Sequence, residues 1–592
     1  MKDFLKYTLA TVTGLVITGV LFFFIGIMVI SGIAASSDTS VTVKKNSILM
    51  LNLDGQLSER VQDKPWTRIF GNDDQSIGLD DVLSAIKKAK SNDDIKGIYI
   101  QAKLLSSSFA SYQEIRDALL DFKKSKKFII AYSDTYTQGL YYLSSVADKI
   151  ILNPQGSITW KGLATQITYM KNLFDKLGVE QQVFKVGTFK SAVEPLTSTS
   201  MSDANRLQMT DLLGSLWGKM VKDVAASRHL TPSRLNEIAD NGTVLFNDAK
   251  MCISTHMADT LLYKSDVKDY LKKKVGIDKD DNLNILGIND MSNVKDKASK
   301  DKSGNEIAVY YACGDIVDES STSSSLSDEQ IVGDEVVSDL RDLRENDDVK
   351  AVVLRVNSPG GSAFASEQIW HAIQLLKAKK PVVVSMSDYA ASGGYYISCG
   401  ANKIVAEPTT LTGSIGIFGV IPNFTKLANK IGLTFDGVKT NKMSDLGVLG
   451  TSLTPEEKSL IQMRIANGYN TFVSRCAQGR KMSKSAIESI AQGRVWSGEK
   501  ALKLGLVDEM GNIDKAIAIA AKLSKISNYS ITSYPEQKSI LSALLKEKPD
   551  NYIETRLLKS RLGNYYEAFS FINSLQKQST IQARIPFFLN IN

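Results

Sequence analysis

Histidine and cysteine are scarce in this chain of 592 residues, which contains three of the former and four of the latter. The cysteines lie far apart, with no Cys-x-x-Cys pair and no Cys/His spacing typical of a metal site. We therefore expect buried, apolar thiols rather than metal ligands, while a disulfide in an oxidising compartment stays open. The four are Cys252, Cys313, Cys399 and Cys476.

Charge of one sign is not concentrated anywhere. The formal net charge is +7, but lysines and acidic residues are mixed throughout, and no basic stripe carries interleaved aromatic side chains. This distribution disfavours a nucleic-acid partner. Hydrophobic residues make up 43% and charged residues 23% of the chain, as in globular rather than disordered proteins. Because the chain is longer than a single core usually supports, we expect two domains with extensions.

A long hydrophobic run occurs once, at the N-terminus, and no second span of comparable length follows. Residues Tyr7 to Ala34 carry no charge, and about 20 apolar residues suffice to cross a bilayer. We interpret residues 7–35 as a transmembrane anchor after a cytoplasmic tail of residues 1–6, whose two lysines favour that side. A secretory signal has a shorter apolar region, but small residues at 31–36 leave a cleaved signal open.

The remainder of the sequence contains a repeat. Asn-Asp-Asp at 92–94 recurs at 346–348, Ser133-Asp134 recurs as Ser387-Asp388, and Tyr141-Tyr142 recurs as Tyr395-Tyr396. Every pair is separated by 254 positions, and a constant offset indicates two copies of one fold. The expected divisions are a first copy at 36–277, a polar linker at 278–305, a second copy at 306–533 and a C-terminal tail at 534–592.

Short apolar runs alternate with helical patterns in both copies, which predicts an α/β fold with parallel sheets and right-handed crossovers. The runs are short and nearly continuous, as expected for strands buried on both faces. The predicted strands are 48–53, 97–100, 128–131 and 150–152 in the first copy and 307–312, 351–354, 382–385 and 404–406 in the second, with helices at 115–124 and 369–379.

Ser392 stands in Ala-Ser-Gly-Gly at 391–394, between a predicted strand and a predicted helix. Backbone N–H groups are free there and the helix dipole is positive, which suits an acyl-transfer nucleophile beside an oxyanion site. A second glycine pair follows the preceding strand, so we expect the N–H groups of Gly361 and Gly393 to face one carbonyl oxygen. The alternative is that Ser392 is an ordinary helix N-cap.

Comparison of the copies separates these interpretations. The first copy keeps the strands and the Tyr-Tyr helix, but it has Gln138 in the position of Ser392 and lacks both glycine loops. Because the fold does not require the serine, the nucleophile is favoured over the cap.

A serine nucleophile needs a base, and a lysine can serve if burial lowers its pKa. Lys190 is the candidate in the first copy, and its counterpart in the second is Ser444. Each copy thus lacks what the other has, which fits one active site assembled from both. A Ser-His-Asp site with His371 is the alternative, and by chemistry alone Lys190 is also compatible with an ordinary surface lysine.

Three motifs together resemble the signal peptide peptidase A family, in its long, duplicated, membrane-anchored bacterial form. The resemblance extends from the anchor to about Ala520, and it implies tandem domains with the fold of the Clp protease and crotonase superfamily. The motifs are Ala-Ser-Gly-Gly-Tyr-Tyr at 391–396, Asn-Ser-Pro-Gly-Gly at 357–361 and Gly-Thr-Phe-Lys-Ser-Ala-Val-Glu-Pro at 187–195.

The same resemblance implies a role for each site residue. Ser392 would be the nucleophile, Lys190 the general base, and Ser414 the residue that orients the lysine amine by a hydrogen bond. Gly393 would donate an oxyanion N–H, with Gly361 as the second donor.

The implied protein is a serine endopeptidase with a Ser/Lys dyad that needs no cofactor or metal. It would degrade remnant signal peptides and other unfolded apolar peptides at the bacterial inner membrane, with its catalytic part on the periplasmic side, as a homotetramer. Two rivals stay open: an acyl-CoA hydratase-like enzyme of the same superfamily and a non-catalytic membrane scaffold.

Overall fold

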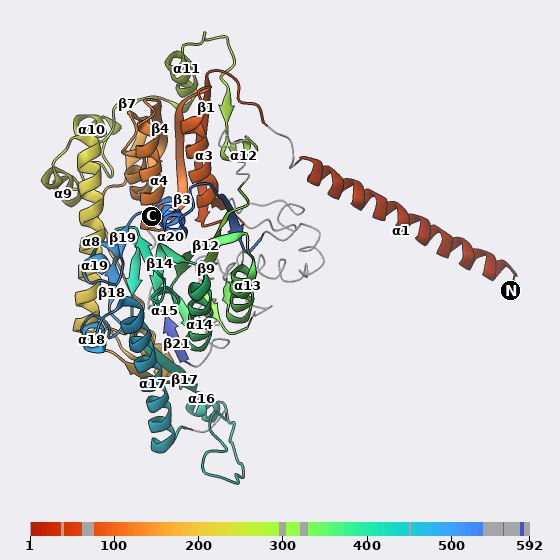
Figure 1. The fold of residues 1–592 in the computed structure, drawn as a ribbon, viewed down its shortest axis with the longest axis vertical. Helices are drawn as coiled ribbons and strands as arrows, with labels where there is room; N and C mark the ends of the chain where they lie inside the picture. The colour runs from red at the N-terminus through yellow and green to blue at the C-terminus, as the bar shows by residue number, and fades with distance from the viewer. Residues whose placement is uncertain are drawn as a thin grey trace.

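The computed structural model describes residues 2–36, 41–61, 76–294, 303–319, 330–448, 452–536, 561 and 581–584. Two α/β units lie one above the other, and a single helix projects away from them (Figure 1). Residues 37–40 at the start of the expected first copy, part of the expected linker (295–302) and most of the expected tail after residue 536 lie outside the described residues.

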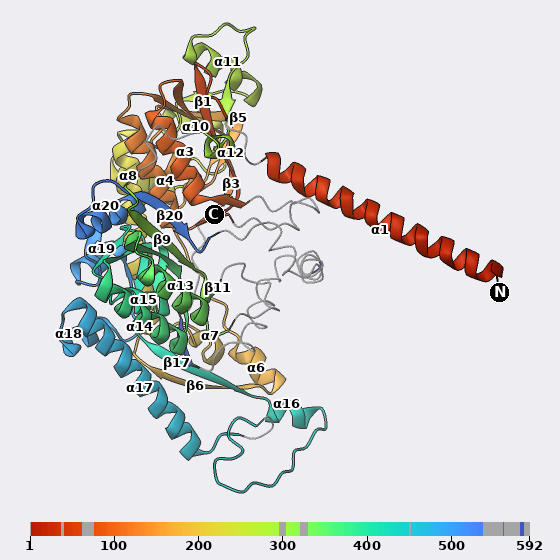
Figure 2. The ribbon, with the colours of Figure 1, turned by 45° about the vertical axis from the view of Figure 1, so that its right-hand side comes forward.

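The projecting helix is α1 (Lys2–Ser36). Its window Asp3–Phe22 is long and apolar enough to cross a membrane, and no residue in that window is buried against the protein. Figure 2 shows α1 leaving the side of the molecule from which α16 also protrudes. An uninterrupted apolar helix without a protein partner is what a membrane anchor requires.

The first copy is built on a parallel sheet of seven strands. The segment expected to be a linker adds a strand and a short helix to this copy, because its apolar residues pack there. The strands follow the order β2 (Ser76–Gly78), β1 (Ser47–Ser58), β3 (Ile95–Ser106), β4 (Phe128–Tyr136), β5 (Lys149–Ile158) and β7 (Thr260–Leu261), with β8 (Ile285–Leu286) beside β1.

The second copy repeats this order, so the duplication read from the sequence is also a duplication of topology. Each of the eight predicted strands lies inside one of these strands, at equivalent places in the two sheets. The central strands β9 (Glu306–Cys313), β12 (Val349–Ser358), β14 (Val382–Ala391), β15 (Lys403–Ala406) and β19 (Glu509–Met510) are joined by β16 (Leu411–Gly413), β18 (Val495–Ser497) and β20 (Ser530–Tyr534).

Helices cover both sheets and follow the same order along the chain in the two copies. The predicted helices at 115–124 and 369–379 are parts of longer ones that begin six residues earlier. The helices are α3 (Leu79–Ser91), α4 (Phe109–Lys123), α5 (Gln138–Ser144), α6 (Lys171–Leu177), α7 (Glu194–Thr197), α8 (Asp203–Arg228), α9 (Pro232–Asp240), α10 (Ala249–Ser254), α11 (Lys264–Val275) and α12 (Ile288–Ser292), then α13 (Gly333–Glu345), α14 (Ala363–Lys379), α15 (Gly393–Ser398), α16 (Thr425–Lys430), α17 (Pro455–Arg480), α18 (Lys484–Ile490), α19 (Gly498–Lys503) and α20 (Ile513–Ser524).

The ends of the two long helices, α8 and α17, are fixed in the same way. Arg228 pairs with Asp259 at 2.7 Å, and Arg480 pairs with Asp508 at 3.0 Å. Each aspartate also accepts a hydrogen bond from the first residues of β5 or β15. The same ion pair therefore ties each long helix to its sheet.

A third sheet connects the copies. In it β6 (Glu180–Val186) from the first copy runs antiparallel to β17 (Ile417–Asn423) from the second over its whole length. Sequence periodicity does not reveal this pairing, because the two strands are more than 200 residues apart. The other strands are β10 (Asp315–Val317), β11 (Gln330–Val332), β13 (Gly360–Ser362) and β21 (Ile581–Arg584), in the order β11-β10-β13-β21-β17-β6.

A buried charge cluster also joins the copies. The guanidinium of Arg355 on β12 bonds Glu59 at 2.8 Å and Glu114 at 2.6 Å, and the three side chains are at most 3% exposed. The two carboxylates hold the pKa of Arg355 well above its ordinary value. Because buried charges need such compensation, this cluster fixes the orientation of one copy on the other.

Candidate active site

Lys190 reaches the second copy through the chain that follows β6. The backbone N–H of Phe189 donates to the carbonyl of Gln492 at 2.9 Å. Gly493 lies flat against Lys190: a Cβ on this glycine would stand 2.6 Å from Lys190 Cβ, and its φ is +80°. Only glycine allows this approach and this backbone conformation together, so Gly493 sets the position of the lysine.

Side chains of α8 hold the same segment from the other side. Gln208 donates through Nε2 to the carbonyl of Phe189 at 3.1 Å and to Ser191 Oγ at 3.0 Å. Next along the segment, Glu194 accepts hydrogen bonds from Ser202 and Asn205 near the start of α8. Apart from the exposed Ser202, these groups are buried or partly buried, so hydrogen bonds also hold the segment that carries Lys190 from this side.

Ser392 lies in the turn between β14 and α15, as the sequence predicts. Its φ and ψ are 55° and −112°, and its side chain makes no capping hydrogen bond. A non-glycine residue in this region costs about 1–3 kcal/mol, and the turn is fixed in part by the bond from Ser392 N–H to the carbonyl of Gly413 at 2.9 Å. The N-cap interpretation does not describe this serine, since its hydroxyl turns elsewhere.

The hydroxyl of Ser392 turns toward Lys190. Lys190 Nζ lies 2.8 Å from Ser392 Oγ, 3.1 Å from Ser414 Oγ and 3.4 Å from the carbonyl oxygen of Ser414. Ser414 itself has a positive φ of 51° and donates its N–H to the carbonyl of Arg494 at 2.7 Å. Two strained serines from the second copy therefore converge on one amine from the first.

The surroundings of the amine are dry. Lys190, Ser392 and Ser414 are all fully buried. Burial lowers the pKa of Lys190 well below its ordinary value of 10.5, because a low-dielectric environment disfavours the charged form. The ring of Phe418 lies 5.9 Å from the nitrogen. A neutral lysine that contacts a hydroxyl is able to accept its proton.

The two glycine loops meet beside Ser392. A Cβ on Gly393 would stand 3.1 Å from the backbone nitrogen of Gly361, and a Cβ on Gly360 would stand 2.8 Å from the nitrogen of Gly393. The N–H of Gly360 is itself bonded to Ser358 Oγ. The backbones of Gly361 and Gly393, the two amides singled out from the sequence, therefore lie close together.

The alternative residues lie elsewhere. His371 is exposed on α14, whereas the hydroxyl of Ser392 is fully buried. Ser444, the counterpart of Lys190, is also exposed. Gln138, the counterpart of Ser392, fills its own site: its side-chain oxygen accepts from Lys161 and Gly162 N–H, and its amide donates back to Gly162. The equivalent position in the first copy is closed by hydrogen bonds.

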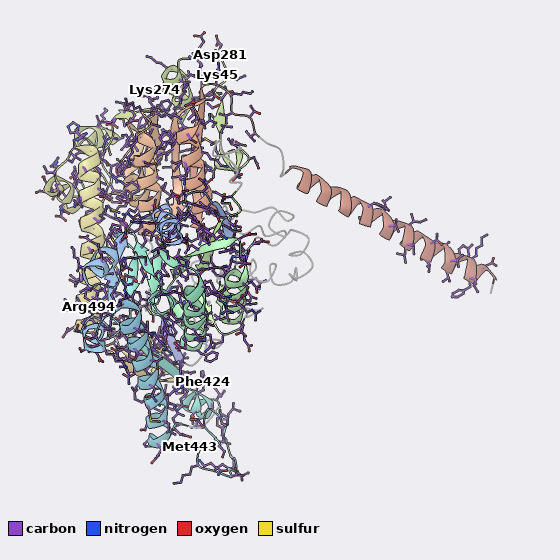
Figure 3. The ribbon with its side chains drawn as sticks, in the orientation of Figure 1. Lys45, Lys274, Asp281, Phe424, Met443 and Arg494 are labelled. Carbon is purple, nitrogen blue, oxygen red and sulfur yellow. The ribbon has the colours of Figure 1, made fainter. Side chains whose placement is uncertain are left out.

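Several residues of the site were not predicted. In the sequence, Gly493 belongs to no motif and nothing connects it to Lys190. Arg494, labelled in Figure 3, stacks on Phe189 and Trp496 and pairs with Asp211 of α8. The strand β21 belongs to the tail, for which the sequence gives no pattern.

Comparisons with known proteins show the family of this chain. The model of peptidase family S49 matches residues 121–278 and again 374–527, and the Clp protease model matches 309–410. Protease 4 of Salmonella typhi is 40% identical over 479 residues, which cover 80% of this chain and 76% of that protein.

Two further relatives span similar shares. Protease 4 of Haemophilus influenzae is 33% identical over 542 residues, covering 88% of this chain and 87% of its own. The chloroplastic serine protease SPPA of Arabidopsis thaliana is 31% identical over 485 residues, covering 82% and 70%. The resemblance read from the three motifs, the duplication and the Clp protease-like fold are confirmed.

Proposed function

This chain belongs to peptidase family S49 and is a serine peptidase, and on that premise we propose that Ser392 and Lys190 form its catalytic dyad. The observation that carries the proposal is the 2.8 Å contact between amine and hydroxyl in fully buried surroundings. A nucleophile needs a base within hydrogen-bond reach, and these two groups meet that requirement.

The reaction follows from the positions of the groups. Neutral Lys190 takes the proton of Ser392 while Oγ attacks the peptide carbonyl. The developing oxyanion is stabilised by the N–H groups of Gly393 and Gly361, which are already in place. The amine then protonates the leaving nitrogen, and water, activated by the same amine, releases the acyl group from Ser392.

Ser414 orients the amine in this scheme. Its hydroxyl and carbonyl oxygens accept two N–H bonds from Lys190, so the remaining lone pair faces Ser392. Because only the uncharged amine is a base, the rate rises with pH through the lowered pKa of Lys190 in the folded enzyme. No cofactor or metal takes part.

The proposed substrates are remnant signal peptides and other unfolded apolar peptides. β21 lies between β13 and β17 and is antiparallel to both, and we take this place, the substrate cleft, as the one that a substrate strand occupies. A substrate that takes this place must be extended and must offer its backbone to both neighbours. A folded protein does not present such a strand.

The proposed location is the bacterial inner membrane. α1 would span it once, with residues 1–6 in the cytoplasm, because Lys2 and Lys6 favour that side. The catalytic part would then stand on the periplasmic side, where spent signal peptides remain after secretion. Assembly as a homotetramer is part of the same proposal and follows from the family resemblance.

The test is cleavage of an unfolded apolar peptide by the full-length protein in detergent. Ser392→Ala and Lys190→Met should each lower kcat by at least about a thousandfold, since each removes a member of a cooperative pair. Ser444→Ala, which changes an exposed serine at the position equivalent to Lys190, is the matched control and should leave kcat unchanged. An active Ser392→Ala enzyme would defeat the assignment.

A further inference from the structure

A strand from the end of the chain is seated in the substrate cleft. β21 pairs with β13 through Gly360, Gly361 and Ser362, and with β17 through Phe418 and Gly419. Both pairings are antiparallel, so β21 has a backbone neighbour on each side. An extended peptide bound by β-augmentation would have the same neighbours, and β21 is therefore a guide to how this cleft holds a peptide.

Ala583 is the residue of this strand nearest the oxyanion amides. It is fully buried and pairs with Gly361. A Cβ on Gly360 would overlap the carbonyl oxygen of Ala583 and stand 2.8 Å from the nitrogen of Gly393. The carbonyl oxygen of Ala583 and the backbone nitrogen of Gly393 thus lie on either side of the space that a Cβ on Gly360 would fill. Ala583 is 0% exposed, so we expect a small residue at this position of a bound peptide.

The next residue, Arg584, contacts a partly buried carboxylate. Its Nη2 lies 3.0 Å from Asp315 Oδ2, and the two side chains are 14% and 21% exposed. Asp315 is on β10, which pairs with β13 on the side opposite β21, so Arg584 reaches Asp315 across β13. Burial raises the pKa of Asp315, and Arg584 acts in the opposite direction. A carboxylate removed from water in this way gains from a cation supplied by the bound strand.

We propose that Asp315 is a specificity-determining residue that selects peptides with Arg or Lys immediately after the small residue seated against Gly360 and Gly361. The bond cut is the one between these two residues, with the small residue contributing the carbonyl and the basic residue the leaving nitrogen. The proposal rests on Ser392 as the nucleophile. It adds a charged determinant to a cleft otherwise suited to apolar chains.

The chemistry is that of ordinary peptide hydrolysis. Ser392 Oγ bonds to the carbonyl carbon of the small residue, the C–N bond to the basic residue breaks, and Lys190 passes the serine proton to that nitrogen. Water then replaces the ester, leaving a carboxylate on the small residue. Asp315 takes no part in these bonds. It holds the guanidinium or ammonium of the departing half and so acts on which peptide is cut.

The experiment uses full-length protein in detergent and four peptides that differ at one position. Each is an apolar peptide with a single internal Ala-Xaa step, where Xaa is Arg, Lys, Gln or Glu, and the cut position is read by mass spectrometry. The wild type should cut the Arg and Lys peptides with a kcat/KM at least about tenfold above that of the Glu peptide. D315N should remove this preference, and D315K should reverse it.

The Gln peptide separates this proposal from the proposed function. All three proteins should cut it, and its kcat/KM in each protein is the reference for that protein's other three peptides, because D315N and D315K also break the pair with Arg584 that holds β21. If no peptide is cut by any of them, the catalytic assignment fails. If the Gln peptide is cut and D315N keeps the preference for Arg, the assignment of Asp315 is overturned.

A third variant, in the tail, checks that β21 does not itself cause the preference for Arg and Lys peptides. Arg584→Ala removes the cation of β21 and leaves Asp315 unchanged. Because β21 competes with every peptide alike, this change should lower KM for all four by one common factor and leave their ratios as in the wild type. A loss of the Arg preference in Arg584→Ala would show that the tail, and not Asp315 acting on the peptide, sets the selectivity.

Discussion

The burial of Lys190 is unfavourable for a charged amine and is explained by its role as a neutral base. A fully buried lysine must give up its proton or be paired, and the causes that act on its pKa reduce to desolvation. Its hydrogen-bond partners are hydroxyl and carbonyl groups of Ser392 and Ser414, which solvate the neutral amine without charging it. The protein thus carries an unfavourable residue at the place where a base is needed.

This leads to a prediction on stability and pH. Between the lowered pKa of Lys190 in the folded protein and 10.5, the ordinary pKa of lysine, the unfolded chain holds a proton on Lys190 that the folded chain has released. Within this window the stability of the wild type rises with pH. Lys190→Met has no such proton. Its gain in free energy of unfolding over the wild type should shrink by about 1.4 kcal/mol per pH unit as pH rises toward 10.5.

Urea denaturation of both proteins at pH 7, 8, 9 and 10 measures this difference. Lys442→Met, at an exposed lysine, controls for the loss of a lysine as such. A difference between Lys190→Met and the wild type that does not change with pH would mean that Lys190 is charged in the folded protein, contrary to the role given to it.

At the scale of elements, the site forms where the ends of β14 and β16 meet the segment after β6 that carries Lys190. β14 ends in the strained turn at Ser392, and β16 ends before Ser414. Gly493, two residues before β18, contacts Lys190. None of these elements carries more than one of the three polar groups. The geometry therefore depends on how closely backbones approach, and Gly493 makes the approach to Lys190 itself.

Gly493→Ala tests that dependence. Its new Cβ would stand 2.6 Å from Lys190 Cβ, so the lysine must move, and a displacement of about 1 Å can cost a hundredfold in rate. We expect kcat to fall by at least about a hundredfold while the fold is kept. Gly432→Ala is the matched control, because its φ of +85° imposes similar backbone strain but nothing lies within 4 Å of its Cβ.

Steady-state kinetics and thermal unfolding of both variants distinguish position from strain. Both should lose stability of about 1–2 kcal/mol from the left-handed backbone, and Gly432→Ala should keep wild-type kcat. Equal kcat in the two variants would contradict the account of Gly493.

At the scale of the molecule, the dyad exists because two copies are held in one orientation. The pairing of β6 with β17 brings the arm of the first copy across the second, α8 packs Leu212 and Leu216 on Leu411 and Val495, and the Arg355 cluster closes the interface. β6 and β17 lie in the lower part of the molecule and α8 lies at its left side (Figure 2). A substitution at any of these interface contacts would change how Lys190 and Ser392 are placed relative to each other, although it lies outside the site.

Arg355→Met should show this. It leaves Glu59 and Glu114 buried without their cation, which costs about 3–5 kcal/mol in the free energy of unfolding. Lys379→Ala removes an ion pair of similar length, 2.7 Å to Glu345, between side chains that are both 54% exposed, and should cost less than about 1 kcal/mol. Chemical denaturation measures both, and similar values for the two variants would refute the interface role of Arg355.

Much of this architecture can be predicted from the sequence because the repeat is local and regular. A constant offset of 254 fixes the equivalent strands, and burial on both faces makes each strand a continuous apolar run. The same comparison singles out Ser392 and Lys190, since each is absent from the other copy. Strand ends were predicted too short, because polar residues such as those at the end of β3 and β14 continue the ladder after the apolar run stops.

The rest depends on contacts between distant segments, which no local pattern encodes. β6 and β17 pair across the copies, and β21 enters the cleft from a tail without periodicity. Asp315 gives no signal of its own, since a single aspartate after a strand is ordinary in a sequence. Its meaning comes only from Arg584, 269 positions later, lying against it.

The most direct test of the account is to map the residue modified by a serine-directed acylating probe on the full-length protein. We predict modification of Ser392 by mass spectrometry, slowed by at least about a hundredfold in Lys190→Met and unchanged in Lys442→Met. Modification of a different residue, or equally fast modification of Ser392 in Lys190→Met, would contradict the claim that an amine from one copy activates a hydroxyl from the other.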